Sequence, residues 1–353
     1  MEQNHYNQLD VFRGLAALSV CAVHFNYNSN FFHNYFAMGI FVQLFFSLSG
    51  FVIFLNYHKS LNKFQDLTKF VKKRFKRLYP LHFFFLIIFA LLECLKYFLS
   101  VKYGFSGDDK LFEVNNIKNF LLNIFFLQHF AESSNFNVPA WSISVEIMLY
   151  ITFALLILYL KRFIVLVSII YSIFFIFLFS DLYGASNTIN AYYSGLYSFF
   201  IGCLFCYLFI KNKIFIKSFF YEIFYLIIIT LFISEIFYFK LLVKYNYLYS
   251  IFFGLIFFLS CYLNKNSIIY KFLFNSFFIF LGKISYSIYL SHLLVITLLS
   301  RFLRFVLKYP YTDGSLQLTL LEANLYTLLA YFITIIFSCF SYKYVEMKFY
   351  RKS

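Results

Sequence analysis

Residues 9–27 read LDVFRGLAALSVCAVHFNY, a stretch long and apolar enough to cross a bilayer as a helix. Two of its side chains, Arg13 and His24, are ionisable and unfavourable against lipid. Eleven positions turn a helix by about 1100°, about 20° beyond three full turns, so both side chains share one face about 16 Å apart. Such groups face a bundle interior or an aqueous cavity, where they mark an ion path, a proton relay or a catalytic site.

The composition extends this interpretation to the whole chain. Of 353 residues, 62% are hydrophobic and 13% charged, whereas soluble domains have about 45–50% and about 25%. This excludes a water-soluble globule and predicts an all-α, polytopic transmembrane helical bundle with about ten spans. The expected spans are 9–27, 36–56, 80–99, 141–160, 163–180, 191–210, 218–238, 248–263, 284–300 and 323–342.

The distribution of lysine and arginine predicts the orientation. The loops 57–79, 161–162, 211–217 and 264–283, together with the tail 343–353, hold twenty of the thirty basic residues. Because cytoplasmic loops are enriched in such residues, both termini are expected in the cytoplasm. No long polar segment separates the spans, so we expect one integral-membrane domain over residues 1–353 without an appended soluble domain.

The cysteines point to packing rather than to redox or metal chemistry. All six fall in expected spans: Cys21, Cys94, Cys203, Cys206, Cys261 and Cys339. Cys203 and Cys206 form a lone CxxC without a second pair to complete a metal site. Buried free cysteine behaves as a small hydrophobe, so neither a disulfide nor a bound metal is predicted.

A basic segment precedes the third expected span. Its lysines and arginines suit a membrane anchor that contacts anionic lipid head groups. Arg74 and Arg77, however, are three positions apart, so on a helix they would present two guanidinium groups on one face. That pair suits a polyphosphate. Both interpretations stay open from the residues alone.

The fourth expected span begins with Trp141 and Ser142 and carries Glu146 one turn later. Trp141, the single tryptophan, is also typical of the aromatic belt at a membrane interface. Glu146 lies about 7 Å below the expected external surface, where a carboxylate needs a partner or a function. His24 is expected at a similar depth, so the two can form a carboxylate–imidazole pair that orients a base.

Two polar patches interrupt other spans. One contains Ser49 in FFSLSG, residues 45–50. The other is GKISYSIYLSH, residues 282–292, which contains Ser285, Tyr286, Ser287 and His292. Small and hydroxylated residues in membrane helices commonly form helix–helix contacts. The alternative is that these residues, with Trp141 and Ser142, line a pocket.

Taken together, these segments resemble the integral-membrane acyltransferase family 3, which O-acylates bacterial surface polysaccharides. Six segments carry the resemblance in order: Leu9 to Ala17 leading to His24, Phe45 to Gly50, Arg74 to Pro80, Trp141 to Glu146, Gly282 to His292, and Ser341 to Glu346. They extend over nearly the whole chain. Ile147 and Met148 depart from the family pattern, which often has a second acid and a glutamine there, and this weakens a mechanism with two carboxylates.

The resemblance implies a multi-pass protein of the bacterial inner membrane that uses cytoplasmic acyl-CoA, usually acetyl-CoA, as co-substrate. The acyl group would pass to a hydroxyl of a carbohydrate or lipid-linked glycan, such as O-antigen, capsule or another exopolysaccharide. By the same analogy His24 is the catalytic base, Arg13 lines the acyl-CoA path, and Arg74 and Arg77 engage the nucleotide phosphates. Glu146 would position His24, and an acyl-histidine intermediate is the competing path. No nucleic acid is expected as a partner.

Two other functions remain open at this point. Intramembrane Arg, His and Glu also suit a proton-coupled or anion transporter. An acyltransferase acting on a lipid or small-molecule acceptor would use the same residues. Thioester cleavage distinguishes both acyltransferases from the transporter.

Overall fold

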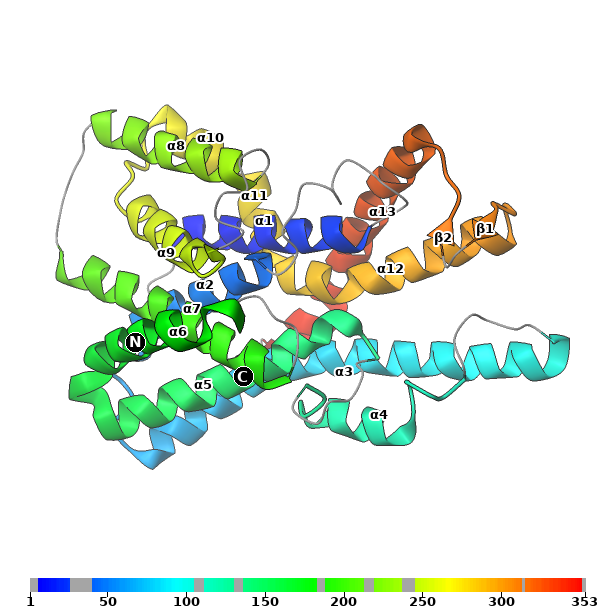
Figure 1. Cartoon of the computed structure of the whole chain (residues 1–353), viewed down its shortest axis with the longest axis horizontal. Coiled ribbons are helices and arrows are strands. Elements are labelled where there is room, and N and C mark those ends of the chain that lie inside the picture. Colours follow the sequence, from blue (N-terminus) through cyan, green and yellow to red (C-terminus); the bar gives the residue numbers. More distant parts are fainter. Residues whose placement is uncertain are drawn as a thin grey trace. The chain divides into compact units, whose positions relative to one another are not determined.

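The computed structural model describes residues 6–25, 40–104, 111–129, 136–182, 188–212, 219–236, 245–312 and 315–350. The described chain is almost entirely helical (Figure 1). The longer helices are α1 (Asn7–His24), α2 (Ile40–Tyr57), α3 (Phe64–Tyr103), α5 (Trp141–Leu160), α6 (Ile164–Phe179), α7 (Thr188–Lys211), α8 (Phe219–Ser234), α9 (Leu248–Ser260), α12 (Ser285–Phe305) and α13 (Leu320–Ser341). The shorter elements are α4 (Ile117–Ile124), α10 (Ile268–Leu273), α11 (Ser276–Lys283), α14 (Met347–Tyr350) and the two-stranded β1 (Tyr311–Thr312) and β2 (Ser315–Leu316).

The predicted all-α membrane bundle is confirmed, and each of the ten expected spans coincides with one of the longer helices over its described residues. Within the described ranges, six helical segments are long and apolar enough to cross a membrane: Ile40–Tyr57, Phe64–Tyr103, Val138–Phe179, Asn190–Lys211, Ser285–Phe305 and Leu320–Phe349. Two apolar helices, α8 and α9, are shorter. The cytoplasmic placement of both termini stays a prediction.

Helix α3 differs from its expected form. It begins at Phe64 rather than at Pro80, so the basic segment and the third span are one helix of 40 residues (Figure 1). Pro80 therefore lies inside the helix and removes one backbone hydrogen bond. Membrane helices tolerate such a proline because neighbouring groups satisfy the freed carbonyl.

The described chain contains two compact units, each assembled from three stretches of sequence. The first comprises residues 1–19, 35–72 and 148–285, and the second 20–34, 73–147 and 286–353. Neither unit is a continuous segment of the chain. The expectation of a single domain stays a prediction.

In the first unit, α2 and α7 pack backbone against backbone. A Cβ on Gly50 would overlap the carbonyl oxygen of Phe199, and a Cβ on Gly202 would overlap that of Ser47. Close approach through small residues is the usual way that membrane helices associate. Cys203 lies in this contact and donates from Sγ to the Gly50 carbonyl at 3.5 Å, as expected of a packing cysteine.

A buried polar network strengthens the same contact. Gln43 of α2 donates to Ser194 at 3.2 Å and accepts from Ser198 at 2.7 Å, both on α7. Ser250 of α9 donates to Ser198 at 2.8 Å. Buried polar side chains are thereby paired with one another across three helices.

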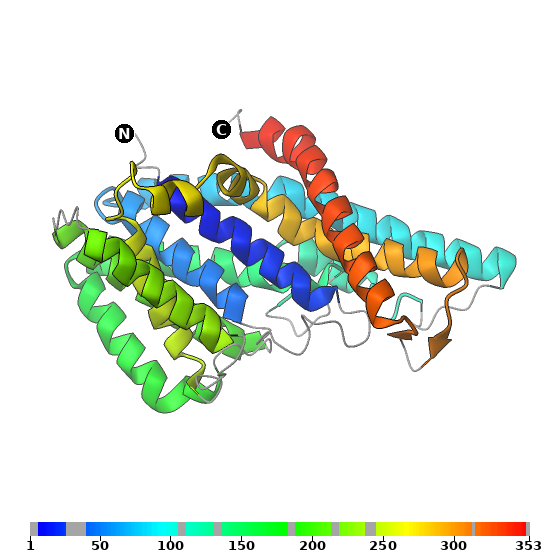
Figure 2. The ribbon, with the colours of Figure 1, turned by 90° about the horizontal axis from the view of Figure 1, so that it is seen from above.

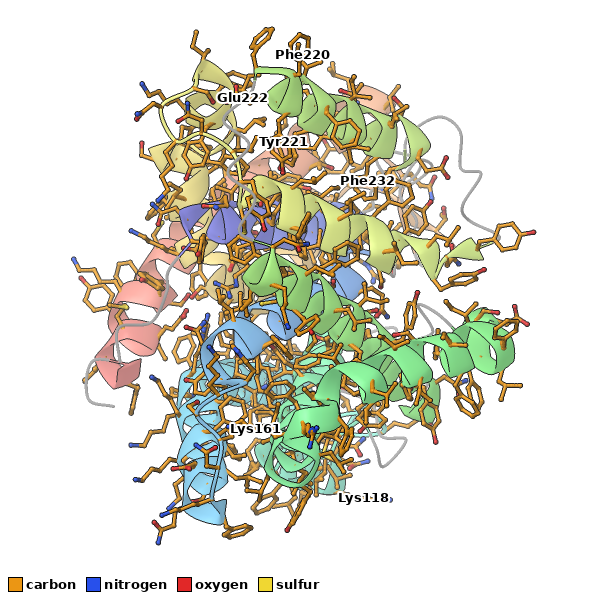
Figure 3. All side chains as sticks on the ribbon, turned by 90° about the vertical axis from the view of Figure 1, so that its left-hand side faces the viewer. Lys118, Lys161, Phe220, Tyr221, Glu222 and Phe232 are labelled. Carbon is orange, nitrogen blue, oxygen red and sulfur yellow. The ribbon has the colours of Figure 1, made fainter. Side chains whose placement is uncertain are left out.

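Helix α8 joins this unit through α9. Tyr221 donates to the Leu259 carbonyl at 2.8 Å, and the rings of Phe232 and Phe253 lie 5.4 Å apart. Figure 3 labels Tyr221 and Phe232 on α8. Phe220, one position before Tyr221, is 80% exposed. Such outward phenylalanines are expected where a helix meets lipid.

In the second unit, short polar contacts connect α3, α4, α12 and α13. The His82 ring of α3 lies 2.9 Å from the Asn123 carbonyl of α4, and Ser291 of α12 lies 3.0 Å from Ser338 of α13. After Ser341 the chain continues as a π-helical turn, Tyr342–Glu346, and then bends into α14 (Figure 2).

Candidate active site

His24 is the last residue of α1, and its neighbour Phe25 fixes this helix end within the second unit. Phe25 is fully buried, its ring packs edge-on against Tyr331 of α13 at 4.9 Å, and its carbonyl accepts from Thr327 at 3.4 Å. His24 itself is only partly buried. The end of α1 is therefore anchored, while His24 keeps part of its surface accessible.

The ring facing His24 belongs to His292 of α12. The two imidazole centroids lie 5.1 Å apart, and the ring planes are tilted by 43°. His292 is fully buried, and its Nδ1 lies 3.3 Å from the Ile288 carbonyl one turn earlier. Its Nε2 is buried without a hydrogen-bond partner among the described residues. The structure thus pairs two imidazoles from helices far apart in sequence.

A hydrogen-bonded triangle lies on the α12 side of this pair. Tyr289 donates to the Pro139 carbonyl at 3.0 Å, and its hydroxyl lies 2.7 Å from that of Ser142. The Ser142 hydroxyl also lies 3.1 Å from the Pro139 carbonyl oxygen, so its single proton goes either to that oxygen or to Tyr289. The Tyr289 ring lies 6.0 Å from that of His292. The Ser142 hydroxyl, expected to line a pocket, therefore joins α5 to α12.

Glu146 lies one turn beyond Ser142, within electrostatic range of the Tyr289 hydroxyl. The neighbouring ring described for His24 is that of His292. The pairing of His24 with Glu146 that the sequence suggests stays a prediction.

Trp141 begins α5 beside a second buried histidine. The rings of Trp141 and His129 lie 5.3 Å apart, and His129 is 5% exposed. Gln128 donates to the Ala140 carbonyl at 3.1 Å, and Asn137 donates to the Leu290 carbonyl of α12 at 2.9 Å. These contacts hold the loop before α5 against the helix that carries His292.

The beginning of α12 contacts the basic part of α3. Tyr286 donates to the Leu78 carbonyl at 2.7 Å, and Ser287 donates to the Glu346 carboxylate at 3.1 Å. Arg77 lies within electrostatic range of Glu346. The predicted phosphate-binding arginine thus shares its surroundings with a carboxylate.

Arg74, one turn earlier on α3, is 8% exposed. Its burial means that its guanidinium contacts protein as well as any ligand. A groove of about 660 Å³ lies along another face of α3, between Phe75, Pro80 and Ile87 and the chain end at Tyr344 and Phe349. Its lining in the described chain includes neither Arg74 nor Arg77, so it does not coincide with the predicted phosphate site.

Three predicted site residues belong to the first unit. Arg13 forms a salt bridge with Asp10 at 2.7 Å. Ser49 lies 3.5 Å from the Tyr150 hydroxyl, and Ser285 donates to the Gly282 carbonyl at 2.8 Å. Because a Cβ on Gly282 would overlap the Asp10 carbonyl, the backbones of α1 and α11 nearly touch beside this salt bridge.

Sequence reasoning did not single out Tyr289 or Glu346 as site residues. The spacing of Tyr289, three positions before His292, places it on the same helical face and is a usable signal. Glu346 is the last residue of the π-helical turn, and its partners Ser287 and Arg77 lie far away in sequence. One sequence offers no signal for that contact.

The chain matches the model of a known protein family. The family model of acyltransferase family 3, described as an acyltransferase domain, matches residues 6–343. No curated protein and no solved structure matches the chain.

Proposed function

The chain belongs to the acyltransferase 3 family, and on that premise we propose that it moves an acyl group from cytoplasmic acyl-CoA to a hydroxyl of a cell-surface carbohydrate. Acetyl-CoA is the proposed donor, and O-antigen, capsule or another exopolysaccharide the proposed acceptor. The proposed location is the bacterial inner membrane, with the carbohydrate free or linked to lipid. The observation that carries the proposal is the partly buried residue His24 beside a fully buried His292, in a chain that matches the acyltransferase family model over residues 6–343.

In the proposed reaction, neutral His24 takes the proton of the acceptor hydroxyl as that oxygen attacks the thioester carbonyl carbon. A carbon–oxygen bond forms, the carbon–sulfur bond then breaks, and the proton passes from His24 to the leaving thiolate. The products are an ester and free coenzyme A. General-base help of this kind contributes about 10²–10⁴ in rate. In the alternative path, His24 itself attacks the thioester and carries the acyl group.

Arg74 and Arg77 are the proposed partners of the nucleotide phosphates. Both lie on α3 in its basic, N-terminal part, where the positive-inside pattern places the cytoplasm. The same orientation puts Arg13 toward the donor side and His24 toward the acceptor side of α1. We therefore place Arg13 along the acyl path.

The test is acyl transfer by purified protein in liposomes with acetyl-CoA. Coenzyme A release is measured with a thiol reagent, and glycan acetylation by mass spectrometry. His24→Ala should lower kcat about 10²–10⁴-fold, whereas the matched control His58→Ala should retain activity.

Normal transfer by a correctly inserted His24→Ala protein would contradict both paths. Movement of acetate or another anion across the vesicle membrane without coenzyme A release would indicate a transporter instead. Coenzyme A release with acetylated lipid in place of glycan would change the acceptor class.

A further inference from the structure

The buried ring of His292 has a defined tautomer. Its Nδ1 lies 3.3 Å from the Ile288 carbonyl, and a carbonyl oxygen can only accept, so Nδ1 carries the proton. Full burial favours the neutral ring. Nε2 is therefore a lone-pair acceptor, and it has no hydrogen-bond partner among the described residues.

His24 is the ring that can supply a donor to this nitrogen. The two centroids lie 5.1 Å apart, which is within reach of an N–H···N bond of about 2.9 Å once the rings turn toward each other. The structure itself does not contain that bond. Of the other rings beside His292, Phe25 has no polar hydrogen, and the Tyr289 hydroxyl hydrogen-bonds to Pro139 and Ser142. Catalytic hydrogen bonds are commonly longer before substrate binds.

We propose that His292 is a positioning residue for His24. Its Nε2 accepts a hydrogen bond from one ring N–H of His24, which leaves the other nitrogen of His24 free to take the acceptor's proton. When His24 becomes an imidazolium, the same bond stabilises its charge until the proton passes to the thiolate. This inference rests on the proposed function.

An imidazole suits this role in a membrane helix. In hydrolytic triads a carboxylate orients the base and balances its charge. A carboxylate at membrane depth carries a charge that is costly when unpaired, whereas a pair of neutral imidazoles carries none before the reaction. The His24–His292 pair is charged only while the proton is in transit.

Several other titratable groups surround the pair. Cys21 lies on α1, Glu146 on α5, Tyr289 on α12 and Tyr331 on α13. Since these remain in place when His292 alone is changed, a difference in pH dependence between variants at position 292 reports on the imidazole contact.

Two substitutions of His292 test the roles of its two ring nitrogens separately. His292→Asn keeps a donor near Nδ1 for the Ile288 carbonyl and removes the acceptor at Nε2. His292→Gln places an amide oxygen near the Nε2 position. We expect His292→Asn to lower kcat about 10–100-fold, the usual effect of losing one hydrogen bond to a charged group, with little change in KM. The acid limb of the kcat/KM profile should move to lower pH. His292→Gln should recover most of kcat and the wild-type acid limb.

Other outcomes overturn the proposal. Wild-type kinetics in His292→Asn would do so, as would equal losses in both variants with an unchanged pH profile, which indicates packing. A raised KM with unchanged kcat would place the acceptor hydroxyl on His292. An active His24→Ala protein would contradict the proposed function itself, whereas an inactive His24→Ala with a normal His292→Asn would contradict only this inference.

A measurement on the unmodified protein tests the proposal even if the variants do not fold. Nitrogen NMR of ¹⁵N-histidine-labelled protein distinguishes protonated from lone-pair ring nitrogens, and His292→Gln assigns the signals. The expected result is a protonated Nδ1 and a lone pair on Nε2 of His292. A protonated Nε2 at neutral pH would overturn the proposal.

Discussion

At the scale of single residues, Arg77 is a better candidate than Arg74 for binding the proposed donor, acyl-CoA. Arg74 is 8% exposed, so its removal disturbs packing as well as charge. Arg77 is more accessible and lies near the Glu346 carboxylate, which is itself hydrogen-bonded by Ser287. A phosphate arriving at Arg77 must compete with that carboxylate. Arg77 is consequently the cleaner probe of the donor site.

We expect Arg77→Ala to raise KM for acetyl-CoA at least about tenfold, because a hydrogen bond to a charged group contributes about 1.5–3 kcal/mol. The KM is obtained from initial rates measured at a series of acetyl-CoA concentrations. Lys76→Ala is the matched control, since Lys76 lines the neighbouring groove. An unchanged KM in Arg77→Ala would remove this residue from the donor site.

Among the elements, the α2–α7 pair is the best-defined contact of the first unit. Gly50 and Gly202 each face backbone of the opposite helix. Backbone cannot move aside as a side chain can, so an added methyl must separate the helices. Gly254 of α9 differs, because its nearest neighbour is the Phe205 ring.

We predict that Gly50→Ala and Gly202→Ala each destabilise the protein by about 1–3 kcal/mol. Gly254→Ala should cost less, because the Phe205 ring can rotate. Thermal unfolding in detergent, followed by circular dichroism, orders the three variants. Equal transition temperatures for all three and the wild type would show that this contact contributes little.

The elements also show what one sequence can reveal. Helices were predictable because lipid demands long apolar segments, and Arg13, His24 and Glu146 stood out because such segments rarely contain ionisable groups. The extension of α3 through Pro80 was not predictable, because proline is also common at the first position of a helix. Contacts such as Ser142–Tyr289, 147 positions apart, depend on which helices become neighbours, and hydropathy carries no information about that.

At the scale of the whole molecule, most candidate site residues belong to one unit. His24, Arg77, Glu146 and His292 fall in the second unit, whereas Arg13 falls in the first. Helix α1 contains both Arg13 and His24 and is therefore shared by the two units. The direction of α1 across the membrane decides whether Arg13 or His24 lies toward the side of the proposed donor, acyl-CoA.

The predicted orientation can be tested by labelling single cysteines with a membrane-impermeant maleimide. Lys118 of α4 and Lys265 are both exposed. They lie between spans that the predicted topology connects on opposite sides of the membrane. In a Cys94→Ser background, chosen because Cys94 is exposed, Lys118→Cys should react in intact spheroplasts. Lys265→Cys should react only after permeabilisation, and the reverse pattern would invert the topology.

The network around Gln43 has a consequence for the order in which the protein is made. Its partners Ser194 and Ser198 follow it by 151 and 155 positions, which takes about 8–30 s at a synthesis rate of about 5–20 residues per second. During that interval the Gln43 amide sits in a nascent membrane helix without its final partners. For those seconds Gln43 of α2 can form hydrogen bonds with groups other than its final partners. This period ends only after α7 has been synthesised and can pack against α2.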